Sequence, residues 1–211
     1  MGKFDNALND DKEAVSLLEQ VKKGHPDAPE LGRLLFLAYR RRGELLNDLG
    51  RYREARADYD AALPHAEPGV RSLLLTFRIM TLAREGEHRQ AVKDVANLEF
   101  WSNKDPVALY NLACARSEIA AAVARDQMIP LAVRTKEAEQ HARRAIELLR
   151  KAQEGKFFEN NAYRKLLDTY PPLSYIRGRE DFLQLRRDIE DATKNNPEGI
   201  KKNENEAENP K

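Results

Sequence analysis

The stretch GELLNDLGRYREARADYDAAL, residues 43–63, decides the fold class of this chain. Apolar residues at helical spacing continue up to Leu49, and Gly50 then interrupts the pattern before a second amphipathic segment that carries Ala55 and Ala62. A glycine between two such segments is typical of a helix end, and small residues allow two helices to approach closely. The stretch therefore predicts an antiparallel helical hairpin.

The same arrangement of helix, turn and helix recurs along the chain. The spacing of apolar residues and the positions of Gly and Pro place the helix boundaries. Helices are predicted from Asp10 or Asp11 to Gly24, from Pro29 to Gly50, from Gly50 to Pro64, from about Val70 to Glu85, around Ala91 to Leu98, from Asp105-Pro106 to about Arg125, from Pro130 to Gly155, from Phe157 to Asp168 and from Asp181 to Ala192.

Two of these hairpins align with each other. When their turns are superposed, Gly43 and Ala55 of one hairpin fall beside Ile79 and Ala91 of the next, which gives a repeat unit in the mid-thirties. On this period and these small residues the chain resembles tetratricopeptide-repeat proteins from about Lys12 to Gln153. It departs from that motif at Arg42, where the motif has leucine, and at Ile79, where it has a small residue, so we expect the second full hairpin to be splayed.

The resemblance implies an all-α fold, a right-handed α-solenoid of tetratricopeptide-like hairpins with a C-terminal helical cap. We expect one domain over residues 1–194, and a disordered polar tail over 195–211 because those residues are almost without apolar side chains. The repeats are expected at about 12–28, 29–66, 69–101 and 105–154, and the cap at 156–194.

A narrower resemblance rests mainly on the sequence YNLACA, residues 110–115. Together with residues 15–63 and 176–189, it is similar to the repeat region that follows the catalytic domain in many planctomycete serine/threonine kinases. The chain contains no glycine-rich phosphate loop, no His-Arg-Asp and no Asp-Phe-Gly motif of a kinase domain. This likeness leaves open a regulatory role in cis on a kinase domain that is absent from the chain.

The family resemblance also implies where a partner would bind. In such proteins the first helix of each hairpin lines a concave groove, and matching helix positions gives a mixed polar and apolar lining that suits a peptide or a helix. The alternative is that several of these side chains only pack within the protein. The candidate binding residues are Arg40, Glu44, Asn47, Asp48, Thr76, Met80, Arg84, Tyr110, Asn111, Cys114 and Ser117.

Composition excludes several other functions. The 36 basic and 35 acidic residues give a formal charge of +1, which provides no long-range field for nucleic acid. We expect the arginines at 40–42 and at 51, 53 and 56 to be solvated and paired with nearby acids, and the four histidines, far apart in sequence, to lie at the surface. Since no nucleophile, base or metal-ligand set can be brought together, we expect a non-enzymatic protein-interaction scaffold without cofactor or metal.

Two further expectations concern the setting of the protein. The single cysteine, Cys114, and the lack of a long apolar run favour a cytoplasmic protein that does not bind membranes. The helix from Asp11 to Lys23 has the pattern of the second half of a repeat. A structural or self-associating module, in which this helix completes its hairpin with another copy as a homodimer, therefore stays open.

Overall fold

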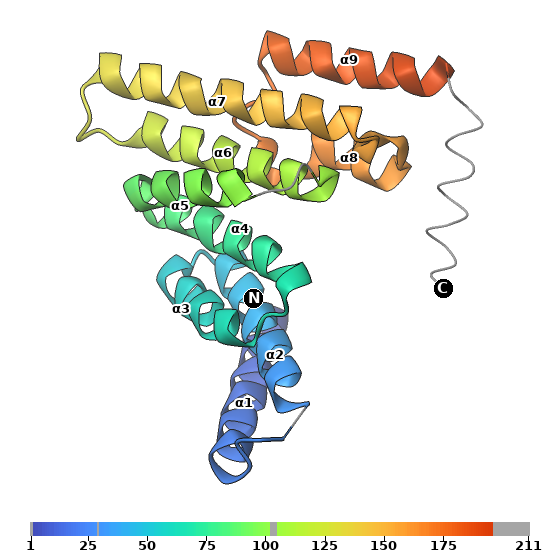
Figure 1. The fold of residues 1–211 in the computed structure, drawn as a ribbon. Helices are drawn as coiled ribbons and strands as arrows, with labels where there is room; N and C mark the ends of the chain where they lie inside the picture. Colours follow the sequence, from blue (N-terminus) through green and yellow to red (C-terminus); the bar gives the residue numbers. More distant parts are fainter. Residues whose placement is uncertain (1, 29, 102–104, 196–211) are drawn as a thin grey trace. The chain divides into compact units, whose positions relative to one another are not determined.

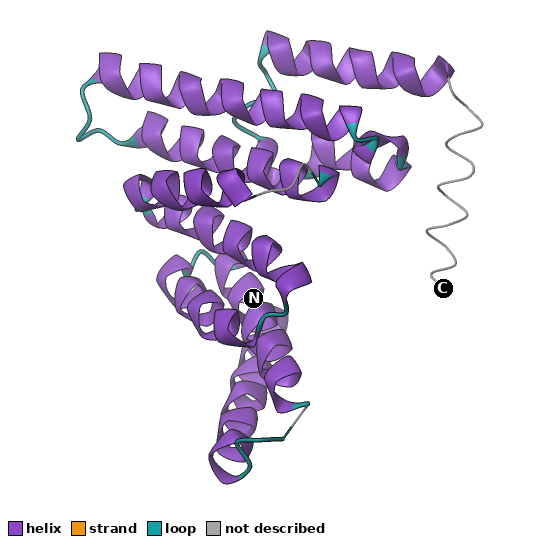
Figure 2. Ribbon diagram, in the orientation of Figure 1, coloured by secondary structure: helices purple, strands orange, loops and turns teal. Residues whose placement is uncertain are grey.

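The computed structural model describes residues 2–28, 30–101 and 105–195, and all regular structure in these ranges is helical (Figure 2). The predicted all-α class is thereby confirmed. In chain order (Figure 1) the α-helices are α1 (Gly2–Gly24), α2 (Leu31–Asp48), α3 (Tyr52–Ala62), α4 (Pro68–Glu85), α5 (His88–Trp101), α6 (Pro106–Arg125), α7 (Leu131–Glu154), α8 (Asn161–Thr169) and α9 (Glu180–Asn195), with short 3-10 helices η1 (Leu63–His65), η2 (Phe157–Glu159) and η3 (Pro171–Leu173).

The described helices fall into two compact units, Met1–Ala91 and Val92–Lys211. The boundary lies inside α5, so the repeat predicted at 69–101 has its first helix in the first unit and most of its second helix in the second. Each unit is described by itself.

The hairpin predicted from residues 43–63 is formed by α2 and α3. Gly50 adopts φ 73°, a left-handed conformation that glycine tolerates, and the Arg51 amide donates to the Leu46 carbonyl oxygen at 2.8 Å, which closes the end of α2. A Cβ built on Gly43 would lie 2.8 Å from Cε1 of Tyr59 and 3.3 Å from the Ala55 carbonyl oxygen. The two helices therefore touch where the sequence predicts, at Gly43 and Ala55.

The core of the first unit is built from successive helix pairs, α1 on α2, α2 on α3 and α3 on α4. Its buried side chains come from all four helices: Leu8, Phe36, Leu46, Ala55, Tyr59, Ala62 and Leu74. Helix α1 begins at Gly2, earlier than the predicted start at Asp10 or Asp11. The reason is that the earlier residues carry no helix-breaking Gly or Pro after Gly2, and Leu8 continues the buried face of α1 toward its N-terminus.

Arg42, the departure from the repeat motif, has a buried partner. Its guanidinium donates to both carboxylate oxygens of Asp58, with Nε to Oδ2 at 2.8 Å and Nη2 to Oδ1 at 2.6 Å. The Asp58 side chain is only 6% exposed. An ion pair between α2 and α3 thus replaces the apolar contact that a leucine would make.

In the second unit α6 packs along α7. Helix α6 ends at the predicted Arg125, and α7 begins at Leu131, one residue after the predicted Pro130. Both helices carry buried alanines, which allow close packing. On one face of α6 these are Ala113 and Ala120, and on one face of α7 they are Ala138, Ala142 and Ala145. Helix α6 is long and apolar enough to span a membrane by length and composition, but 67% of its apolar window is buried inside the protein.

The C-terminal cap differs from the sequence prediction in one place. The single helix predicted from Phe157 to Asp168 is wrong, because η2 ends at Glu159 and a new helix, α8, begins at Asn161. Asn160 adopts an extended backbone, and its side chain accepts from the Ala162 amide at 2.8 Å as the N-cap of α8. Of the tail predicted at 195–211, residues 196–211 lie outside the described part of the chain.

Candidate functional site

The first group of predicted binding residues lies on α2, at the surface of the first unit. Arg40, Glu44 and Asn47 are partly exposed and Asp48 is exposed. Arg40 pairs with Glu44 at 3.4 Å. Burial raises the pKa of Glu44, with Arg40 opposing the shift and Asp48 adding to it. These four side chains form a polar strip that a partner can reach.

Helix α4 adjoins this strip and contributes less of it than predicted. The Thr81 hydroxyl lies 3.1 Å from the Asn47 side-chain oxygen, which links the C-terminal parts of α4 and α2. Arg84 is partly exposed. Thr76 and Met80, however, are buried at 2% and 6% exposure, and the Thr76 hydroxyl donates to the Ser72 carbonyl oxygen. These two side chains belong to the interior and offer no surface to a partner.

The second group, on α6, is also mostly buried. Tyr110, Cys114 and Ser117 are at most 3% exposed, whereas Asn111 is partly exposed. Burial raises the pKa of the Cys114 thiol to about 12, so the thiol stays protonated and unreactive near neutral pH.

Tyr110 is buried by rings from the chain's own cap. It stacks on Phe157 with ring centroids 4.8 Å apart, meets Phe158 edge-on at 6.3 Å and lies 6.3 Å from Tyr170. The expectation that Tyr110 faces a groove assumes that nothing covers α6. The aromatic residues that cover it follow more than 45 positions later in the sequence, so the helical pattern of α6 alone gives no sign of them.

The arginine clusters of the first unit are paired, as the sequence predicts. In addition to the Arg42–Asp58 and Arg40–Glu44 pairs, contacts of 2.6 to 3.4 Å join the remaining four arginines to carboxylates. They are Arg41 with Asp11, Arg51 with Glu54, and Arg53 and Arg56 with Glu85.

The histidines are dispersed, and within residues 2–28, 30–101 and 105–195 no group of three or more His, Cys, Asp or Glu side chains is arranged to hold a metal ion. The prediction that all four lie at the surface is wrong for His88, which is 5% exposed. His88 occupies the first position of α5, where the helix begins to pack. His141 lies 3.1 Å from Nη1 of Arg116, in a group where Arg116 and Arg144 also bind Glu99.

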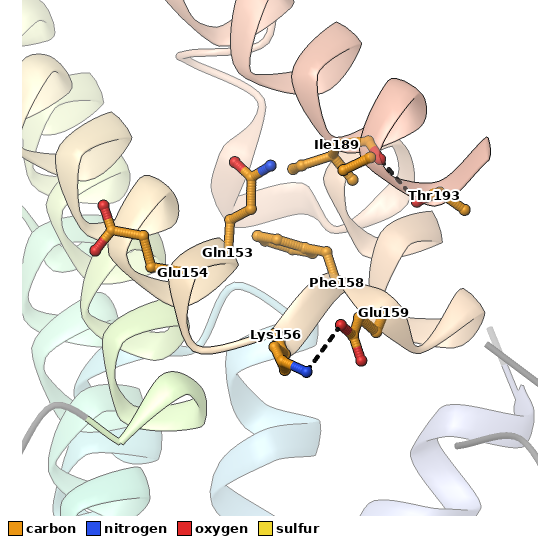
Figure 3. Close-up of a pocket in the computed structure, with 8 residues that line it drawn as sticks. Gln153, Glu154, Lys156, Phe158, Glu159, Ile189 and Thr193 are labelled. Atoms are coloured by element: carbon orange, nitrogen blue, oxygen red, sulfur yellow. Dashed lines mark hydrogen bonds and ion pairs between the residues drawn. The ribbon is translucent and has the colours of Figure 1, made fainter. Parts of the chain in front are cut away.

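One concavity in the second unit was not predicted. It is a pocket of about 300 Å³ between the C-terminal end of α7, η2 and the last turns of α9 (Figure 3). Two segments separated in sequence line it, residues 153–159 and 189–193, so no local motif marks it. Its lining residues are Gln153, Glu154, Lys156, Phe158, Glu159, Ile189, Ala192 and Thr193.

A special backbone conformation shapes the mouth of this pocket. Lys156 adopts φ 66°, which is uncommon for a residue other than glycine, and its amide donates to the Gln153 carbonyl oxygen at 2.8 Å. This turn ends α7 and directs the chain into η2. Gly155 is required beside it, because a Cβ there would lie 2.4 Å from Cγ of Pro106.

The pocket has an apolar floor and a charged rim. Phe158 and Ile189 are 1% and 3% exposed, and Figure 3 shows Gln153, Phe158 and Ile189 converging while Glu154 points away from them. At the rim the Lys156 ammonium lies 3.6 Å from a Glu159 carboxylate oxygen. The Thr193 hydroxyl donates to the Ile189 carbonyl oxygen at 2.7 Å. Such a site suits an apolar side chain flanked by polar or charged groups.

Comparison with known proteins adds no relative: no family model, no curated protein and no solved structure matches the chain.

Proposed function

We propose that this protein is a non-enzymatic protein-interaction module that anchors an apolar side chain of a partner segment in the α7–η2–α9 pocket. The observation that carries the proposal is the combination of an apolar floor, Phe158 and Ile189, with the Lys156–Glu159 pair at the rim. We further propose that the helical hairpins are tetratricopeptide-like and follow one another as a right-handed solenoid. That part rests on the repeat pattern of the sequence and on the close α2–α3 contact.

The pocket is large enough for an apolar anchor. A volume of about 300 Å³ accommodates a large side chain such as Leu, Ile, Met or Phe. Complete burial of such a side chain contributes about 1.5–3 kcal/mol. Since a micromolar complex requires roughly 8 kcal/mol, neighbouring residues of the partner must contribute the larger share. The rim charges, Lys156 and Glu159, are the groups available for those contacts.

The polar strip on α2 is a second candidate surface. Arg40, Glu44, Asn47 and Asp48 are accessible, and the Asn47–Thr81 hydrogen bond, which links α2 to α4, supports a shared surface on these two helices. A partner that binds there would depend on charge, and its binding would weaken with salt.

To distinguish between the two candidate surfaces, peptides that bind the full chain are selected from a displayed library of random sequences. We expect the enriched peptides to share one apolar anchor position. Their binding should be lost on Ala192→Trp, which fills the pocket from an exposed position of α9, and retained on the matched control Ala57→Trp, at an exposed position of α3.

Circular dichroism melting of both variants verifies that they fold. If enriched peptides bind Ala192→Trp as well as the wild type, or if no anchor position emerges, the pocket is not the binding site. Loss of binding on Glu44→Lys with no effect of Ala192→Trp would transfer the function to the α2 strip.

A further inference from the structure

Helix α1 has an apolar surface wider than the part that α2 covers. Leu8 and Val15 are buried on one face, at 4% and 2% exposure. Ala14, Leu17 and Val21 follow at i, i+3 and i+7 and so form a second stripe. Leu17 is 53% exposed and Val21 46%. The apolar side chains of this second stripe therefore face outward.

Two leucines of α2 extend this stripe. Leu34 and Leu37 are 41% and 40% exposed and share one face of α2 with Arg41, again at i, i+3 and i+7. The Arg41 guanidinium binds Asp11 at 3.0 Å, and Asp11 lies one turn before Ala14 on α1. Asp11 is 7% exposed and lies on the face of α1 that carries Leu8 and Val15, so this ion pair joins the exposed face of α2 to the border between the buried face and the exposed stripe of α1.

The exposed side chains of α1 and those of α2 also lie at similar heights along the paired helices. A short turn joins α1 to α2, so the helices run antiparallel, and a register that sets Asp11 near Arg41 sets Leu17 and Val21 near Leu37 and Leu34. The result is one patch across both helices, which we call the α1–α2 patch: Ala14, Leu17, Val21, Leu34 and Leu37.

We propose that the α1–α2 patch binds a second copy of this chain, with the two α1 helices antiparallel across a two-fold axis near Leu17. In this arrangement Ala14 of one copy faces Val21 of the other, so that a small residue opposes a larger one. A symmetric pair covers the same patch on both copies, as a closed dimer requires.

The charges of α1 favour this occupant and this direction. The exposed charged residues of α1 are two acids and one base in its first half, Asp10, Glu13 and Lys12, and one acid and two bases toward its end, Glu19, Lys22 and Lys23, which leaves a net −1 and a net +1. Antiparallel pairing brings the acidic half of one helix to the basic end of the other, and it also opposes the two helix dipoles favourably. Parallel pairing would bring like charges together.

This inference concerns the first unit and does not rest on the proposed peptide pocket, so either can fail without the other. Because the patch consists of five side chains, against about 20–30 residues on each side of a standard interface, we expect a weak dimer with a dissociation constant on the order of 10–100 µM. Sedimentation equilibrium of the full chain across that range should show the mass rising toward twice the monomer.

The variant Leu17→Glu should weaken the dimer at least tenfold, because it places a charge at the axis. The matched control is Leu183→Glu on α9, where the leucine is 39% exposed, and it should dimerise like the wild type. A wild-type chain that remains monomeric over the whole range, or a dimer that Leu17→Glu does not weaken, overturns the proposal.

Cysteine cross-linking tests the direction of the helices. The native Cys114 is 1% exposed and does not interfere. An equimolar mixture of Ala14→Cys and Val21→Cys chains should form a mixed disulfide under mild oxidation faster than either variant forms one with itself. Faster self-linking of Val21→Cys indicates parallel helices and overturns the antiparallel assignment.

Discussion

Substitution of one glycine tests whether the α2–α3 hairpin is held by close contact. In Gly43→Ala the new Cβ would lie 2.8 Å from Cε1 and 3.1 Å from Cδ1 of Tyr59. Tyr59 is 1% exposed and Ala55, on the same side, is fully buried, so neither neighbour can move toward solvent. The methyl group must therefore push α2 and α3 apart or force the Tyr59 ring off its preferred rotamer.

Two effects of opposite sign determine how much Gly43→Ala changes the free energy of unfolding. Alanine in place of glycine inside a helix stabilises by about 1 kcal/mol. Overpacking of a well-filled contact costs about 1–3 kcal/mol. The contact is well below van der Waals distance and its neighbours are fixed, so the cost exceeds the gain and we expect a net loss of about 1 kcal/mol.

The same helix provides a matched control. A Cβ on Gly32 would meet only Nδ1 of His65, at 3.8 Å, which is an ordinary contact. Gly32→Ala should therefore be neutral or stabilising by up to about 1 kcal/mol. Urea unfolding followed by circular dichroism compares the two variants with the wild type. Equal or greater stability of Gly43→Ala would refute the reasoning, since the methyl group would then have room.

Three further predictions concern other contacts. Asp58→Ala should destabilise the first unit by about 1–3 kcal/mol in urea unfolding, because it leaves the Arg42 guanidinium without its buried partner. A loss no larger than that caused by removing one partner of a solvent-exposed ion pair would contradict this. Asn160→Ala should cost about 1 kcal/mol through loss of the α8 cap, whereas Asn160→Asp should retain stability in the same melts. Hydrogen bonds from Arg179 lower the pKa of Glu139 to about 2 from 4.5, so the ionised Glu139 stabilises the folded chain above pH 4.5 and this contribution is lost as the pH falls toward 2. Because the Glu139–Arg179 pair is partly exposed, we expect it to contribute under about 1 kcal/mol to the free energy of unfolding. The variant Glu139→Gln should therefore lose correspondingly less stability in acid than the wild type.

Local signals in the sequence predicted most of the helices. Gly50 marks the turn between α2 and α3 because only the left-handed backbone closes it, and Asp105-Pro106 marks the start of α6, where the Asp105 side chain accepts from the Ala108 amide at 2.9 Å. Asn160 was missed because the apolar spacing from Phe157 to Asp168 continues through it. A single capping side chain divided a pattern that periodicity alone reads as one helix.

The candidate site was harder to predict because it depends on contacts between distant segments. Helix periodicity places Tyr110 on one face of α6 and carries no information about Phe157, which covers that face. The α7–η2–α9 pocket likewise joins Phe158 to Ile189, 31 positions later in the sequence. By contrast, the accessibility of Arg40, Glu44, Asn47 and Asp48 could be predicted, since their exposure follows from the local pattern of α2.

The central claim, that the α7–η2–α9 pocket binds an apolar anchor, is tested most directly by a nuclear magnetic resonance titration of the isotope-labelled chain with a library-selected peptide. The proposal predicts that the largest changes in chemical shift occur at Phe158, Ile189 and Thr193, and that they disappear when the anchor residue of the peptide is replaced by alanine. Saturable binding that leaves these three residues unshifted would contradict it.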